Sequence, residues 1–242
     1  RAQDALWLIA VALFLLTPLG MVVLGGLKGL LDLPMSVLQA AWRSVLVSLG
    51  SAFLMLLLAL PMALAAVRLG RGLGASLLEG VGTLAIAASS LVIGTGLFIL
   101  IFPIADPQAL ALPVTALVNA VMSLPFAMRA LVPALRDIEG AYGRLADSLG
   151  MQGWVRVRLL LLPRMRRPLG FALGLAAALS MGDLGVIALF ADPAEATLPL
   201  QLYRLMSAYR MEQAAGAALL LLVLSLGLFW LFDRGGRVRA GS

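Results

Sequence analysis

Long apolar runs are the feature that most constrains what this chain can fold into. Six segments each hold about 20 or more mostly apolar residues, the length that a helix needs to cross the hydrocarbon core of a bilayer. They cover residues 5–27, 45–67, 81–102, 110–132, 168–190 and 213–232. With 62% hydrophobic and 12% charged residues, a water-soluble domain would lack polar surface. The sequence therefore predicts an all-α polytopic membrane protein, with residues 1–242 forming one domain of six transmembrane helices.

Most of the basic residues fall on one side of this predicted arrangement. Of the 18 Lys and Arg residues, the opposite side holds Lys28, Arg43, Arg204 and Arg210. The majority are Arg1, Arg68, Arg71, Arg129, Arg136, Arg144, Arg156, Arg158, Arg164, Arg166, Arg167, Arg234, Arg237 and Arg239. Because basic residues concentrate in cytoplasmic loops, both ends of the chain are predicted to be cytoplasmic.

The sequence lacks the residues on which several kinds of chemistry depend. The chain has no Cys and no His, so disulfides, thiol chemistry and the commonest metal ligand are absent. Its single Lys, Lys28, follows two glycines but precedes Gly29, so there is no phosphate-binding loop of the G-x-x-x-x-G-K-[ST] type. We expect no catalytic residues, metal site, cofactor or nucleic-acid partner.

The segment from residue 137 to 167 is a long basic loop between the fourth and fifth predicted spans, and loops of this length are usually functional or disordered. This one carries apolar residues at helical spacing, followed by a glycine that favours a helix end. The first stripe is Tyr142, Leu145, Ala146 and Leu149, and the second is Trp154, Val157 and Leu161. The spacing predicts two short amphipathic helices that meet at Gly150 and end at Pro163, forming a cytoplasmic projection.

This loop resembles the cytoplasmic motif of ABC-importer permeases, written E-A-A, three residues, G, nine residues, I-x-L-P. The matching positions are Ala146, Gly150, Leu160, Leu162 and Pro163, while Arg144 and Leu145 stand in place of the Glu and the first Ala. The resemblance extends through "SLGMQGWVRVRLLLLPRMRRPL", "ALSMGDLGVIALF" and "TLPLQLYRLMSAYR" to the C-terminal half of the permeases that import thiamine and thiamine pyrophosphate. The motif residues, Arg144 included, are thereby implied to couple the permease to its ATPase.

The resemblance implies a permease of the bacterial inner membrane that uses alternating access. Its expected partners are a cytoplasmic ABC ATPase dimer, a second six-helix permease half, a periplasmic substrate-binding protein and membrane lipid. ATP hydrolysis is expected in the separate ATPase subunit. Because the chain begins with Arg1 rather than Met, we expect it to be the C-terminal half of a longer fused permease.

Asp183 is the one acidic residue well inside an apolar run, and intramembrane acids are functional candidates. With Ser180 and Gly182 it is predicted to line the substrate pathway, where a carboxylate would attract a cation such as thiamine. Alternatively, Gly182 and Gly185 break the helix and Asp183 caps the next turn. Permeases for ferric iron or polyamines remain alternatives within the class, and an ion-coupled secondary transporter that uses Asp183 is an alternative outside it.

Overall fold

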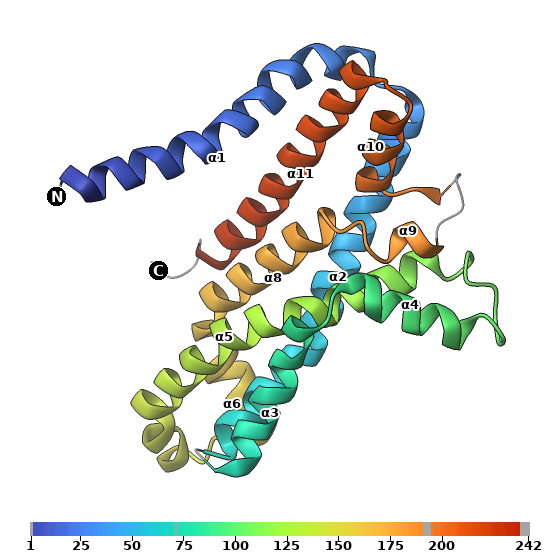
Figure 1. Ribbon diagram of the computed structural model, residues 1–242. Coiled ribbons are helices and arrows are strands. Elements are labelled where there is room, and N and C mark those ends of the chain that lie inside the picture. The colour runs from blue at the N-terminus through green and yellow to red at the C-terminus, as the bar shows by residue number, and fades with distance from the viewer. Residues whose placement is uncertain (1, 71, 191–194, 238–242) are drawn as a thin grey trace.

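A computed structural model describes residues 2–70, 72–190 and 195–237. Within these ranges the chain forms helices and no strands (Figure 1). Arg1, Arg71 and Arg239, which contribute to the predicted charge asymmetry, lie outside the described residues.

The described helices follow one another with short connections. The long ones are α1 (Ala2–Gly29), α2 (Met35–Arg68), α5 (Ala111–Ser148), α8 (Arg166–Met181) and α11 (Met211–Arg237). The shorter α-helices are α3 (Leu73–Thr83), α4 (Ser90–Ile101), α6 (Gly153–Arg156), α7 (Leu162–Arg164), α9 (Ile187–Phe190) and α10 (Leu198–Ser207). Two 3₁₀ turns, η1 (Leu30–Asp32) and η2 (Leu84–Ala87), and one π-helical turn, η3 (Val157–Leu161), complete the set.

Four segments of the described chain are long and apolar enough to cross a membrane: Leu6–Asp32, Met35–Arg68, Ala111–Ser148 and Met211–Arg237. The runs predicted at 5–27, 45–67 and 213–232 fall within α1, α2 and α11, and the run predicted at 110–132 falls within α5 except for residue 110. The all-helical membrane class is thus confirmed for the residues that the structure describes.

The runs predicted as the third and fifth spans are interrupted rather than continuous. In the third, α3 ends at Thr83, η2 follows, and the Ser89 side chain accepts a hydrogen bond from the Val92 N–H (3.3 Å) to start α4. A serine at this position stabilises a new helix start, so the run divides. In the fifth, α8 ends at Met181, and the glycines predicted to break the helix separate it from α9.

Helix α5 does not end near residue 132 as the sequence predicted. It continues through Pro133 to Ser148, so the first of the two predicted short helices is the last part of α5. Good helix formers such as Ala134, Leu135 and Arg136 follow the proline, and Arg136 pairs with Glu79 of α3. The segment predicted as a loop is therefore largely helical.

The core lies where α2, α5 and α8 pack together, and alanine dominates it. The fully buried alanines of this core are Ala52, Ala59, Ala63 and Ala66 of α2, Ala120 and Ala127 of α5, and Ala176 and Ala177 of α8. Small side chains let helix backbones approach closely, which is how helices associate in lipid. On its other side α8 packs against α11, where a Cβ at Gly174 would lie 2.8 Å from the Phe229 carbonyl oxygen.

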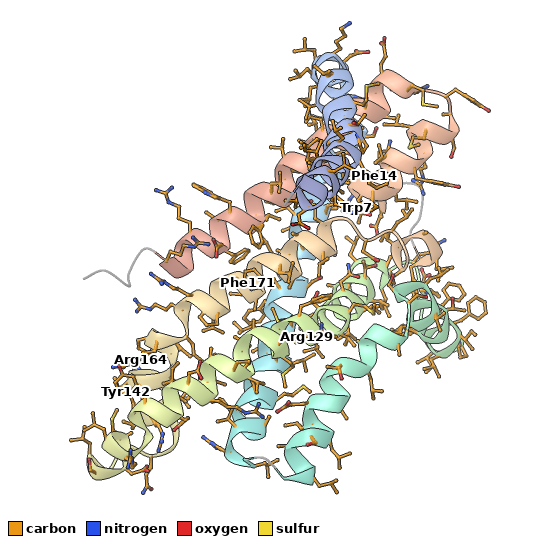
Figure 2. All side chains as sticks on the ribbon, turned by 60° about the vertical axis from the view of Figure 1, so that its left-hand side comes forward. Trp7, Phe14, Arg129, Tyr142, Arg164 and Phe171 are labelled. Carbon is orange, nitrogen blue, oxygen red and sulfur yellow. The ribbon has the colours of Figure 1, made fainter. Side chains whose placement is uncertain are left out.

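Helix α1 stands apart from this core and packs mainly against α11 (Figure 1). The two helices meet near Gly29 and Gly216 and diverge from there toward the start of α1. Figure 2 shows Trp7 and Phe14 on α1, and both side chains are exposed. An exposed apolar helix of this kind is suited to contact with lipid or with another membrane helix.

Replacing Gly216 by Ala should loosen the junction of α1 with α11. The added Cβ would lie 2.5 Å from the Gly29 carbonyl carbon, so the helices must move apart. We expect the free energy of unfolding to fall by about 1–3 kcal/mol, the usual effect of overpacking. Gly227→Ala is the matched control, because nothing lies within 4 Å of a Cβ there. Equal melting temperatures for the two variants in detergent would contradict the close contact.

Candidate functional site

A chain of buried polar groups crosses the three-helix core. Asn119 of α5 donates from Nδ2 to Ser180 Oγ of α8 at 3.0 Å, and Ser180 Oγ lies 2.9 Å from Ser51 Oγ of α2. Ser51 donates its hydroxyl proton to the Val47 carbonyl (2.8 Å), so Ser180 must be the donor in the serine pair. The donors therefore run in one direction, from Asn119 through Ser180 and Ser51 to the backbone of α2.

Asp183 lies beside this chain, in the break between α8 and α9. Ser90, at the start of α4, donates from Oγ to Asp183 Oδ1 at 2.8 Å. The other oxygen, Oδ2, is buried and accepts no hydrogen bond from any residue that the structure describes. A buried carboxylate oxygen without a donor is unfavourable, so this atom is ready to accept a hydrogen bond or to contact a cation.

Asn119 and Ser180 of the polar chain line, together with the carboxylate, a cavity of about 170 Å³. Its lining residues are Asn119, Met122, Ser123, Leu179, Ser180 and Asp183. Of the residues predicted for a substrate pathway, Ser180 and Asp183 thus come together, while Gly182 ends α8 and does not line the cavity. Among the described residues the Asp183 side chain does not cap α9; its hydrogen-bond partner is a side chain of α4.

The glycine turn predicted at Gly150 is confirmed in its local geometry. Gly150 has φ +65°, and the Met151 N–H bonds to the Ala146 carbonyl (2.9 Å) while the Gly150 N–H bonds to the Asp147 carbonyl (3.1 Å). These two bonds form a Schellman motif, which satisfies the last carbonyls of a helix when the next residue adopts the left-handed conformation. The chain then reverses into the α6–η3–α7 segment, Gly153–Arg164, which leads to α8. The end of α5, the glycine turn and this returning segment together are called the hairpin below.

The residues predicted to couple to an ATPase divide into two groups. Ala146 and Leu160 are buried, and they hold the turn against the core. Arg144, Gly150, Leu162 and Pro163 are exposed. The helical segment ends at Arg164, one residue after Pro163 and close to the predicted end.

The two predicted stripes differ in their exposure in the structure. Leu145, Leu149 and Trp154 are 57%, 67% and 69% exposed. Val157 and Leu161 of the second stripe are buried. Leu145 lies in the last turn of α5, Leu149 follows its end and Trp154 lies at the start of α6, so these exposed side chains flank the glycine turn.

Arg156 fastens the returning segment to the end of α5, and sequence reasoning assigned it no such role. Its guanidinium pairs with Glu139, with Nε donating to Oε1 at 3.2 Å, and with Asp147 at 2.6 Å. The hydrogen bonds and charge of these two carboxylates raise the pKa of Arg156 above its ordinary value despite partial desolvation. The pairing residues stand four positions either side of Gly143, where a Cβ would lie 3.1 Å from Arg156 Nη2.

The pattern of acid, glycine and acid at four-residue spacing on one helix face is the signal that could have revealed this site. A second contact between the returning segment and α5 lies nearby: the Arg164 guanidinium of α7 stacks on the Tyr142 ring of α5, 4.2 Å from its centroid. Figure 2 shows these two side chains together at the end of the hairpin. The turn is therefore held on α5 by two separate cationic contacts.

No family model matches the chain, but it is similar in sequence to several known proteins. It is 35% identical over 240 residues to the thiamine transport system permease protein of Salmonella typhimurium, covering 97% of this chain and 45% of the relative. For the permeases of the same name, identity is 38% over 231 residues in Brucella abortus (94% and 42%) and 35% over 241 residues in Escherichia coli (97% and 45%). The chain spans a little under half the length of these relatives. The predicted resemblance is confirmed, and the coverage is consistent with one half of a fused permease.

Replacing Ser180 by Ala should destabilise the polar chain, because it leaves the Asn119 amide without its acceptor. We expect a loss of about 0.5–2 kcal/mol in the free energy of unfolding, since interhelical hydrogen bonds in membranes are individually modest. Ser48→Ala is the control, because Ser48 is buried but its hydroxyl has no partner among the described residues. Thermal unfolding in detergent should separate the two variants. A loss at Ser48 equal to that at Ser180 would argue against the hydrogen-bonded chain.

Proposed function

We propose that this chain is a permease unit of an ATP-driven importer for thiamine or its phosphates, in a bacterial inner membrane. The observation that carries the proposal is the 35–38% identity to thiamine transport system permeases along nearly the whole chain. A cytoplasmic ABC ATPase dimer would supply the energy, a periplasmic binding protein would deliver the substrate, and a second permease half would complete the pathway.

In this proposal six segments cross the membrane and both chain ends are cytoplasmic. Four are the long apolar helices, and the other two are the interrupted pairs α3–α4 and α8–α9. Interrupted helices are tolerated at membrane depth where they are buried in protein or line a cavity, which fits the position of the α8–α9 break beside Asp183. The distribution of Lys and Arg supports the orientation.

The hairpin around Gly150 is the proposed contact with the ATPase. Its apolar tip, Leu145, Leu149 and Trp154, offers a surface that a groove on a partner can cover. Arg156 and the Arg164–Tyr142 contact keep the turn from moving independently of α5. Force applied to the tip is therefore passed on to the long helices.

Helices α5 and α8 connect this tip to the polar cavity. Along α5, Asn119 and Ser148 are 29 positions apart, about 44 Å at 1.5 Å per residue. Ser180 lies near the C-terminal end of α8. Since Asn119 of α5 and Ser180 of α8 are joined by a hydrogen bond, a change in the relative position of these two helices alters the cavity directly. This is the proposed route from ATP binding to alternating access.

Asp183 is the proposed attraction point for a cationic substrate. Its Oδ2 atom is buried without a donor, and the cavity beside it holds the hydroxyl and amide groups of Ser123, Ser180 and Asn119. A cation at this place would gain from the low local dielectric constant. The cavity of about 170 Å³ is too small to enclose a whole thiamine molecule, so it would meet one group of a passing substrate.

Labelled-thiamine uptake by proteoliposomes tests the proposal. The liposomes would contain the intact permease and its ATPase, with binding protein supplied outside and ATP inside. Uptake that requires all of these, and that unlabelled thiamine suppresses while spermidine or ferric iron does not, supports the proposal. ATP-independent uptake driven by an ion gradient would instead identify a secondary transporter.

Replacing Gly150 by Val should uncouple ATP hydrolysis from uptake. A β-branched residue resists φ +65°, so the Schellman turn would rearrange even though the site has space for the side chain. Stimulation of ATPase activity by loaded binding protein should fall by about fivefold or more, for a strain of roughly 1–3 kcal/mol. Gly140→Val on α5 is the control, since its Cβ also meets nothing within 4 Å and its φ is not positive. Wild-type stimulation and uptake in the Gly150 variant would remove this turn from the coupling role.

Asp183→Asn should reduce uptake while the protein stays folded. The amide keeps an oxygen that can accept the Ser90 hydrogen bond, but it loses the charge that attracts a cation. We expect transient substrate binding to weaken by on the order of 1 kcal/mol, about fivefold. Uptake rate and melting temperature are both measured for the wild type, Asp183→Asn and Asp183→Ala, and the two quantities are compared across the three proteins. Normal uptake in the Asn variant, with lower stability in the Ala variant alone, would make Asp183 a structural residue.

A further inference from the structure

A second and larger cleft lies away from the polar cavity, between the returning hairpin segment, the start of α8 and the end of α11. Its volume is about 800 Å³. One part of its wall is apolar and includes Leu173, Leu231 and Phe232. The other part carries three arginines, Arg158, Arg166 and Arg234.

The charge of this cleft is uncompensated. No Asp or Glu is among its lining residues, and none of its three arginines forms a salt bridge within the described ranges. Arg234 is held by stacking over the Trp230 ring, 4.9 Å from its centroid. The neighbouring basic residue Arg237 differs, because it pairs with Asp233 at 2.7 Å. Three guanidinium groups that line one cleft without a carboxylate favour an anionic ligand with several acceptor oxygens.

The position of the cleft selects the kind of anion. Arg166 begins α8 and Arg234 lies in the last turn of α11, a helix apolar enough to cross a membrane. The cleft therefore spans the level at which the apolar helix surface gives way to charge. With α11 placed across a bilayer, the arginines would lie at the depth of the lipid head groups, and Leu173 and Leu231 would line the cleft from positions nearer the hydrocarbon core. A soluble phosphate would leave the apolar wall unused, whereas a phospholipid matches both parts.

We propose that this cleft binds an anionic phospholipid, with its phosphate at Arg158, Arg166 and Arg234 and the start of its acyl chains along α8 and α11. Basic pockets between membrane helices recognise anionic head groups in this way. The bound lipid would contact Arg158 and Leu162 of the segment that joins the coupling turn to α8. It would therefore support that segment through contacts that α5 does not supply. This inference depends on the membrane placement of α8 and α11 and not on the identity of the transported substrate.

The test is lipid binding to the purified intact permease, measured by native mass spectrometry. The probes are dioleoyl phosphatidylglycerol, dioleoyl phosphatidylcholine with the same acyl chains, and inorganic phosphate as a competitor. We expect tighter binding of the anionic lipid, weakened roughly fivefold by Arg166→Gln or by Arg234→Gln and roughly 25-fold by the double variant. Arg210→Gln, which changes an exposed arginine before the opposite end of α11, is the control and should bind like wild type.

Three results would overturn the proposal. The first is equal binding of the two lipids by the wild-type protein. The second is an undiminished preference for phosphatidylglycerol in the double variant with an unchanged melting temperature. The third is displacement of the lipid by inorganic phosphate at equal concentration, or by the ATPase subunit, since either would assign the arginines to another ligand. Retained melting temperature in the double variant separates loss of the lipid site from loss of the fold.

Discussion

The close packing of α2, α5 and α8 through alanine is the interaction on which the rest of this structure depends. In lipid the hydrophobic effect does not drive helices together, because a hydrocarbon chain is as apolar as a leucine. Short side chains bring the backbones near enough for dispersion to act and for short polar side chains to reach across. The hydrogen bonds among Asn119, Ser180 and Ser51 are possible because residues such as Ala120, Ala177 and Ala52 keep these helices close.

The same packing holds together the two ends of the α5–α8 pair to which functions are proposed. At one end the helices are joined by the turn at Gly150, and at the other they meet at the polar cavity. Arg156 prevents the turn from bending on its own, and the buried hydrogen bonds resist separation at the cavity. The cleft with three arginines lies against the α8 arm, where a lipid would support it. Each proposed role thus attaches to a different part of one antiparallel helix pair.

Much of this architecture could be predicted from the sequence, and the misses have physical causes. Uniform apolar runs revealed α1, α2 and α11, and Gly182 with Gly185 indicated the break after α8. The extent of α5 was missed because charged residues such as Arg136 and Glu139 mark the end of an apolar run but not the end of a helix. The contact of Ser51 with Ser180 joins positions 129 residues apart, so no local pattern could reveal it. Trp154 was assigned to an amphipathic stripe by its spacing, yet the spacing of such a stripe does not say whether the protein itself or a partner covers it.

The position of α1 against α11 bears on how the chain reaches its folded state. Within this chain α1 is synthesised first and its main packing partner is synthesised last, so during translation α1 must remain in the bilayer without its native neighbour. The apolar surface of α1 is almost entirely exposed even in the folded chain, so α1 can remain stable in lipid before α11 is made. The final docking then depends on a short stretch around Gly26, Gly29 and Gly216, where backbone meets backbone. Completion of the domain is therefore a late, non-local event, and it closes only after the whole α2–α10 region has been inserted.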